Sequence, residues 1–220
     1  MNWKAIFFDL DGTLVETAPE IADAVNDTLR YFDWPAVYQS EVEQWIGHGT
    51  RELLIQALAK VNAQSVAEVR QGELLREALP IFDRYYQQRC GTRSKLYPHV
   101  LDTLQRLREC GCRLAVVTNK ESRYTDTVLR VHQLTSAFDL VVSGDTFSAK
   151  KPDPVGVLHG LDLWRIDKRD ALFVGDSSID AATARKAGIA VWLLPYGYNM
   201  GEKVIASQPD RVIANFSEIK

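Results

Sequence analysis

The sequence predicts an α/β fold, in which helices cover both faces of a parallel sheet and an all-helical segment is inserted after the first strand. Three observations support this prediction. Short apolar runs rich in β-branched residues alternate with helical segments after Pro98, which is typical of parallel strands buried on both faces. One similar run, residues 5–8, lies near the N-terminus. Residues 15–91 contain helical patterns but no comparable strand.

The first strand, residues 5–8, leads directly to Asp9 and a glycine turn. In the stretch that follows, capping boxes predict helix starts, because a Ser or Thr and a Glu three residues later satisfy two free N–H groups of a first turn. The boxes are Thr17 with Glu20, Ser40 with Glu43, and Ser65 with Glu68. Thr50 predicts the cap of a fourth helix, and Gly91 ends the last helix.

The second half of the chain predicts a Rossmann-like sheet, because helices and strands alternate along it. We expect helices over residues 100–110, 122–132, 155–163 and 179–187, and strands over residues 113–117, 140–143, 171–174 and 190–194. Residues 1–14 and 92–220 would form the α/β core. Residues 15–91 would form a helical cap.

The composition excludes several classes of protein. The chain has 220 residues, 46% of them hydrophobic, and a formal net charge of −3. It therefore has no basic field to attract nucleic acid or an anionic membrane, and no apolar run approaches the roughly 20 residues that span a bilayer. The N-terminus offers no secretory signal. An odd number of cysteines, Cys90, Cys110 and Cys112, argues against a disulfide framework. We therefore expect a cytoplasmic protein, either a monomer or a homodimer.

Acidic side chains follow two of the predicted strands. Asp9 and Asp11 come after the first strand, and Asp176 follows the strand at residues 171–174. Ligands of open α/β sheets bind outside the carboxyl ends of the strands, where Thr118 and Ser143 also lie. Ionised carboxylates at the edge of a core are costly unless they are paired, hydrogen-bonded or bound to a metal. The sequence therefore predicts an acidic, cation-binding cleft.

Four segments resemble, in this order, the four motifs of the haloacid dehalogenase-like phosphatase superfamily. They are Asp9-Leu-Asp11-Gly-Thr-Leu, Val117-Thr118-Asn119-Lys120, Lys151-Pro152-Asp153-Pro154 and Gly175-Asp176-Ser-Ser-Ile-Asp180. The helical stretch 15–91 matches the cap that this superfamily inserts after its first motif. The resemblance thus covers essentially the whole chain.

The resemblance implies a Mg²⁺-dependent phosphatase. Asp9 would be the nucleophile that forms an aspartyl-phosphate, and Asp11 would act as general acid toward the leaving alcohol and then as base toward water. The side chains of Asp9 and Asp176 and the backbone oxygen of Asp11 would hold Mg²⁺, with Asp180 in support.

Other motif residues would bind the phosphoryl group. Thr118, Asn119 and Lys151 would hold its oxygens while charge shifts during transfer. The Lys-Pro pattern favours Lys151 over Lys150 for this role. Thr13 would orient the acids.

The cap carries a second candidate site, a Gly-x-Gly turn that leads into a helix N-terminus and can present N–H groups to an anion. Its residues are Gly47, His48, Gly49, Thr50 and Arg51. Arg51 is well shaped for a carboxylate. Together with Thr17-Ala-Pro-Glu and Tyr196-Gly197-Tyr198-Asn199, this segment is similar to the phosphoglycolate phosphatase family, which implies that 2-phosphoglycolate is hydrolysed to glycolate and phosphate. His99 departs from that family, whose members usually carry Gly there. It is either a surface residue at a helix start or a ring near the cleft.

Several alternatives remain open at this point. The acids taken singly could form turns or cap helices, and Lys151 or Arg51 alone could be surface charges. Within the superfamily, a broader sugar-phosphate phosphatase or a phosphoglucomutase-like enzyme would use the same motifs, whereas a dehalogenase has no evident use for Asp11. A non-catalytic phosphate-binding or protein-interaction module would need no paired nucleophile and acid.

Overall fold

The computed structural model describes residues 3–220 and confirms the predicted parallel sheet. Its strands are β1 (Ala5–Phe8), β4 (Arg113–Val117), β5 (Leu140–Val142), β6 (Ala171–Gly175), β7 (Ala190–Leu193) and β8 (Arg211–Val212). They pair in the order β5-β4-β1-β6-β7-β8, and every pairing is parallel. The two-residue edge strand β8 was not predicted.

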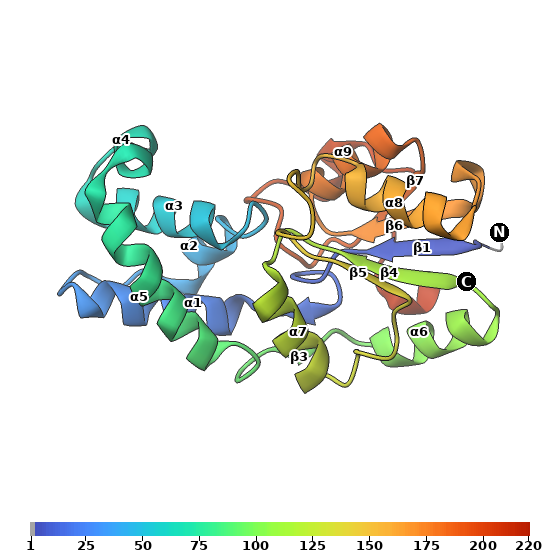
Figure 1. The fold of residues 1–220 in the computed structure, drawn as a ribbon, viewed down its shortest axis with the longest axis horizontal. Helices are drawn as coiled ribbons and strands as arrows, with labels where there is room; N and C mark the ends of the chain where they lie inside the picture. Colours follow the sequence, from blue (N-terminus) through green and yellow to red (C-terminus); the bar gives the residue numbers. More distant parts are fainter. Residues whose placement is uncertain (1–2) are drawn as a thin grey trace.

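Helices cover both faces of this sheet, as expected. They are α6 (Val100–Glu109), α7 (Ser122–Val131), α8 (Val155–Trp164) and α9 (Ser178–Ala187). Figure 1 shows α8 and α9 on one face and α6 and α7 on the other. Each helix and strand that the sequence predicts in this half is present, with ends that differ by at most one residue. Three 3₁₀ helices, at residues 168–170, 204–207 and 216–218, complete the described chain.

The central strand β1 is buried on both faces, which explains its unbroken apolar sequence. Ala5 and Phe7 belong to the buried cluster under α8 and α9, whereas Ile6 and Phe8 belong to the cluster on the opposite face. All four side chains are fully buried. The period of two along a strand therefore divides β1 between two cores.

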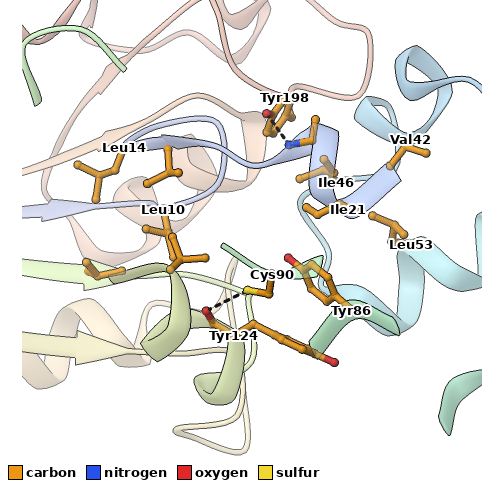
Figure 2. Close-up of a cluster of buried hydrophobic side chains, with 14 of the residues drawn as sticks. Leu10, Leu14, Ile21, Val42, Ile46, Leu53, Tyr86, Cys90, Tyr124 and Tyr198 are labelled. Carbon is orange, nitrogen blue, oxygen red and sulfur yellow. Dashed lines mark hydrogen bonds between the residues drawn. The ribbon is translucent and has the colours of Figure 1, made fainter. Parts of the chain in front are cut away.

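The helices within residues 18–89 form a lobe beyond the carboxyl ends of the strands (Figure 1). They are α1 (Ala18–Tyr31), α2 (Gln39–Glu43), α3 (Thr50–Asn62), α4 (Val66–Gln71) and α5 (Glu73–Arg89). Figure 2 shows that one buried cluster runs from Leu10 and Leu14, next to the sheet, to Ile21 and Leu53 in the helices. The helical lobe therefore packs directly over the ends of the strands. The division into core and cap stays a prediction.

Two short strands join the helical lobe to the sheet. β2 (Val15–Glu16) pairs antiparallel with β3 (Lys95–Leu96), so that the chain leaves for the helices and returns from them side by side. The sequence predicts no strand within residues 15–91 that is comparable to those of the sheet, and it does not predict the two-residue strand at Val15–Glu16. Two residues are too few to display any periodicity in sequence.

The first predicted box marks the start of α1 correctly, with Thr17 at the N-cap position, but its side chains do not form the capping hydrogen bonds. The Thr17 hydroxyl donates to Asp11 Oδ1 at 2.7 Å rather than capping α1. Glu20 Oε2 accepts from the backbone N–H groups of Gly91 and Ser94, at 2.9 and 3.0 Å. Thr17 thus binds the segment that leads into the helical lobe, and Glu20 binds the segment that leads out of it.

The other two boxes have different outcomes. The box at Ser65 and Glu68 is confirmed, with hydrogen bonds in both directions. The box predicted at Ser40 is wrong, because α2 begins earlier. There the Tyr38 N–H donates to Glu41 Oε2 at 2.9 Å.

All three cysteines are free, and Cys90 and Cys112 are buried. In Figure 2 the Cys90 thiol lies against the Tyr124 carbonyl. Within residues 3–220, no helix has the length and apolar character needed to cross a bilayer.

Candidate active site

The predicted acids converge at the carboxyl ends of β1 and β6. Oxygen atoms of Asp9, Asp176 and Asp180 all lie within 4.8 Å of one another, and all three residues are buried. Asp9 follows β1 directly, Asp176 follows β6, and Asp180 lies in the first turn of α9. The parallel strands thus bring together residues more than 160 positions apart.

Lys151 partly neutralises this cluster. Its Nζ donates to Asp180 Oδ1 at 2.7 Å and lies 2.8 Å from Asp9 Oδ1. The second contact is an ion pair without hydrogen-bond geometry, so Asp9 Oδ1 has no hydrogen-bond partner among residues 3–220. Burial lowers the pKa of Lys151, but Asp180 and Asp9 more than offset this and hold it above its ordinary value. Lys151 therefore remains a buried cation.

The negative charge of the three acids exceeds the positive charge that Lys151 supplies. The pKa of Asp9 is raised to about 6, because burial and the nearby Asp180 raise it more than Lys151 lowers it. Burial, with Asp180 and Asp9 nearby, also raises the pKa of Asp176 well above its ordinary value. Such shifts indicate excess negative charge in a dry site, which a divalent cation would relieve.

The residues fit a hard divalent cation. Carboxylate and carbonyl oxygens are the donors that Mg²⁺ prefers, and Asp9 Oδ1 is buried without a hydrogen bond. Asp176 is already oriented, since Oδ1 accepts from the Thr13 hydroxyl at 2.6 Å and Oδ2 from the Tyr198 N–H at 2.5 Å. Each of these oxygens keeps a further lone pair for a ligand. The cluster can therefore hold a cation without rearranging its hydrogen bonds.

Asp180 is held away from the cavity by its own loop. Its Oδ2 accepts from the N–H groups of Asp176 and Ser177 and from the Ser177 hydroxyl. Ser177, not Asp176, is the N-cap of α9. The structure therefore contradicts the alternative in which Asp176 serves only as a helix cap.

Asp11 lies next to a second buried cation, Lys120. Lys120 Nζ donates to both Asp11 oxygens, at 2.9 and 3.1 Å, and to the hydroxyl of Tyr86 from α5. Burial lowers the pKa of Lys120, but Asp11 and the other groups around it together raise it more, so that it stands well above its ordinary value. Thr17 completes this group by its hydrogen bond to Asp11. An acid, a cation and a phenol from three elements thus meet beside the metal-binding candidates.

Thr118 and Asn119 follow β4 and are buried beside the acids. The Thr118 hydroxyl accepts from the Lys120 N–H at 3.2 Å. Asn119 donates from Nδ2 to the carbonyls of Lys151 and Gly47, at 3.0 and 2.9 Å. Asn119 therefore joins the fourth strand, the Lys151 loop and the helical lobe.

The Gly-x-Gly turn lies against the core loops. Lys150 Nζ donates to the His48 carbonyl at 2.7 Å, and the Thr50 hydroxyl donates to Glu121 Oε1 at 2.6 Å. Thr50 is the first residue of α3, and Gly49 is the N-cap. The predicted capping role of Thr50 is therefore wrong. Gly49 has φ +90°, and a Cβ there would lie 2.9 Å from Lys150 Nζ. The positive φ favours glycine at this position.

A cavity lies between the helical lobe and the acids, with about 490 Å³ of free space, part of it open to solvent. Its polar lining contains most of the predicted site, namely Asp9, Asp11, Gly47, Gly49, Thr50, Thr118, Asn119 and Asp176. Lys151 and Asp180 lie behind the acids. Arg51 and His48 are exposed and are not among the lining residues. His99 is also exposed outside the cavity, at the start of α6.

Four polar lining residues were not assigned a role from the sequence: Tyr86, Lys120, Ser177 and Tyr198. Lys120 belongs to the second quoted motif, so its position next to Thr118 was a usable signal. Tyr198 accepts from the N–H groups of Thr17 and Ala18 through its hydroxyl (Figure 2). No local pattern marks Tyr86, which comes from the middle of a long helix.

Comparisons with known proteins agree with this geometry. The family model described as haloacid dehalogenase-like hydrolase matches residues 6–194. A phosphoglycolate phosphatase of Aliivibrio fischeri is 40% identical over 97% of this chain and 93% of its own length, and one of Nitrosospira multiformis is 38% identical over 98% and 93%. The crystal structure of a predicted phosphoglycolate phosphatase from Haemophilus somnus superposes with a TM-score of 0.92 at 32% identity, covering 100% of this chain and 97% of that one.

Proposed function

Because the chain belongs to the haloacid dehalogenase-like hydrolases, we propose that it is a Mg²⁺-dependent phosphatase that hydrolyses 2-phosphoglycolate to glycolate and phosphate. The observation that carries the proposal is the buried cluster of Asp9, Asp176 and Asp180, which lies beside Lys151 and in which Asp9 and Asp176 line a cavity under the helical lobe. The names of the phosphoglycolate phosphatases it resembles supply the substrate.

In this proposal Asp9 is the nucleophile. A bond forms between its carboxylate oxygen and phosphorus while the bond from phosphorus to the glycolate oxygen breaks. Asp11, in its protonated form, donates its proton to that oxygen. In the second step Asp11 takes a proton from water as the water oxygen attacks phosphorus, which releases phosphate and restores Asp9.

Mg²⁺ would be held by the side chains of Asp9 and Asp176 and the backbone oxygen of Asp11. When bound, it supplies positive charge that lets a phosphate dianion approach a carboxylate. Asp180 supports this group by fixing Lys151 and the Asp176 backbone. Lys151 keeps Asp9 ionised, because an adjacent cation favours the charged form of a carboxylate.

Thr118, Asn119 and Lys151 would hold the phosphoryl oxygens. Thr118 and Asn119 line the cavity next to Asp9, and the buried Asn119 side chain is fixed by its two carbonyl partners. Groups that are oriented before substrate binds need no reorganisation as charge shifts during transfer. We propose residues 15–91 as the cap that excludes water from this reaction.

A phosphate-release assay tests the function. We expect release from 2-phosphoglycolate in the presence of Mg²⁺, little release after chelation, and a lower kcat/KM for hexose phosphates and pyrophosphate. Asp9→Asn should lower kcat by roughly 10³-fold or more while the fold is kept. Asp102→Asn, an exposed change on α6, is the matched control.

The possible outcomes test the nucleophile, the substrate and the type of reaction separately. Near-normal turnover by Asp9→Asn would contradict the nucleophile assignment. A clear preference for hexose phosphates would favour a sugar-phosphate phosphatase, and conversion of hexose phosphates without phosphate release would favour a mutase. If no phosphomonoester is hydrolysed, the phosphatase proposal fails and a binding module is left. The cytoplasmic location and the monomer or homodimer stay predictions.

A further inference from the structure

The cavity needs a group that recognises the carboxylate of the proposed substrate. A carboxylate moved out of water into a buried site costs several kcal/mol unless a cation or hydrogen-bond donors receive it. Arg51, which the sequence offered for this role, is exposed and does not line the cavity. Among residues 3–220, Lys120 is the one cationic side chain in the cavity lining.

Lys120 is positioned for such a role by both halves of the site. Its side chain is 1% exposed, so a ligand that reaches it is shielded from water. Lys120 Nζ is shared between Asp11 from the core and the Tyr86 hydroxyl from α5. A phenol that accepts a hydrogen bond still has its own proton to donate. Together they offer a positive charge and a neutral donor.

The position of Asp11 relates Lys120 to the leaving group. Asp11 is proposed to protonate the oxygen that leaves phosphorus, and Lys120 Nζ lies within 3.1 Å of both Asp11 oxygens. In 2-phosphoglycolate a single methylene separates this oxygen from the carboxylate. A carboxylate this close to the oxygen that Asp11 protonates can reach Lys120.

The rest of the lining on the helical side is apolar. Ile21, Ile46 and Leu53 from the helical lobe line the cavity beside Tyr86, and Figure 2 shows Ile21, Ile46 and Leu53 gathered near the Tyr86 ring. These side chains offer no hydrogen bonds to the many hydroxyl groups of a sugar. The wall thus suits a short leaving group with one charged end.

From these contacts we propose that Lys120, assisted by the Tyr86 hydroxyl, binds the carboxylate of the leaving group and makes the enzyme selective for phosphate esters of small hydroxy acids. This inference rests on the proposed phosphatase function and deepens it. The rival role for Lys120 is to position Asp11 alone, which would serve every phosphomonoester equally.

The two roles differ in one measurable ratio. We compare kcat/KM for 2-phosphoglycolate with kcat/KM for 2-phosphoglycolamide, which replaces the carboxylate by a neutral amide of similar shape. Lys120→Met should lower this ratio about a hundredfold, because losing one member of a buried charge pair costs 2–5 kcal/mol. Tyr86→Phe should lower it about five- to tenfold, the usual effect of one lost hydrogen bond. Lys186→Met, an exposed change on α9, should leave the ratio unchanged.

The ratio does not depend on how much of a variant is folded, because both substrates meet the same active molecules. Equal losses on the two substrates would show that Lys120 only positions Asp11 and would overturn the inference. A ratio that falls in Arg51→Ala but not in Lys120→Met would assign the carboxylate to Arg51 instead.

Binding to Asp9→Asn, measured by calorimetry with Mg²⁺ present, separates this inference from the proposed function. We expect tighter binding of 2-phosphoglycolate than of the amide, and loss of that preference in Asp9→Asn/Lys120→Met. If the wild type hydrolyses neither compound, the phosphatase proposal fails while this binding preference still supports the carboxylate site. Equal binding of both compounds to Asp9→Asn would reject the carboxylate site even in an active phosphatase.

Discussion

At the residue scale, His99 holds a backbone conformation that an L-residue rarely adopts. It precedes α6 with φ +67°, in the left-handed region. That conformation costs a non-glycine residue roughly 1–2 kcal/mol, whereas glycine adopts it freely but loses about 0.5–1 kcal/mol more chain entropy on folding. The Gly that the resembled family usually carries at this position thus has a physical reason, the left-handed backbone, which lies outside the active site.

We therefore expect His99→Gly to raise the free energy of unfolding by up to about 1 kcal/mol, which corresponds to roughly 2–4 °C in Tm for a chain of this size. His99→Asn should fall between the two, because Asn tolerates the left-handed region better than His. Urea unfolding and thermal melting check the order. Phosphatase activity should not change, and a stability loss in His99→Gly would contradict the strain argument.

The site residues that the sequence predicts have a local sequence pattern, and most of those that it missed do not. Asp9, Asp11 and Asp176 each follow an apolar strand, so the rule that ligands bind at strand ends predicts their meeting. Lys120 is marked by the motif after β4, but Tyr86 has no such local mark, because its pairing with Lys120 depends on how α5 lies against the loop after β4. Arg51 was chosen for its chemistry and its turn, but the direction of a side chain at a helix start is decided by packing.

At the scale of elements, the α/β half was predicted within one residue because each strand is a continuous apolar run between helices. The helix starts of the lobe were predicted less well. A capping box is a local pattern, and Thr17 and Glu20 both have stronger partners in distant segments, Asp11 and the backbone near Gly91. Tertiary hydrogen bonds override a local cap wherever the helix start is buried.

The start of α1 is capped by a tyrosine from the far end of the chain. The Tyr198 hydroxyl accepts from the N–H groups of Thr17 and Ala18, at 3.1 and 3.0 Å. Tyr198→Phe leaves two buried donors without a partner, and we expect it to lower the free energy of unfolding by about 1–3 kcal/mol. Tyr38→Phe, at a side chain that is 79% exposed, is the control and should change stability by less than about 0.5 kcal/mol. Equal effects in the two variants would show that the hydroxyl does not cap α1.

At the scale of the whole molecule, the cavity depends on contacts that join distant parts of the chain. Asn119 donates to the Gly47 carbonyl, Lys150 to that of His48, and Thr50 to Glu121. The sequence predicts that an inserted segment covers the strand ends, but it does not identify these pairs. The β2–β3 pairing was not predicted for the same reason, since five helices separate Val15 from Leu96 along the chain.

We predict that the stability of the whole molecule depends on a divalent cation bound at the acidic cluster. Asp9, Asp176 and Asp180 repel one another in a buried site that Lys151 only partly neutralises. A cation that binds the folded state alone stabilises it by mass action, by about 2.7 kcal/mol at a hundredfold excess over its Kd. At roughly 2–4 °C per kcal/mol, Mg²⁺ should raise the Tm of the chelator-treated protein by roughly 5–10 °C.

Asp176→Asn removes one proposed ligand while an amide oxygen remains to accept from Thr13 or the Tyr198 N–H. Its Tm should therefore respond little to Mg²⁺, whereas Asp102→Asn, on the exposed face of α6, should keep the full response. Thermal melting with chelator and with Mg²⁺ measures the difference without any substrate. If Asp176→Asn gains as much from Mg²⁺ as the wild type, the cation binds elsewhere on the molecule. The charge crowding at the strand ends would then need another partner, and Lys151 alone would have to keep Asp9 ionised for attack on phosphorus.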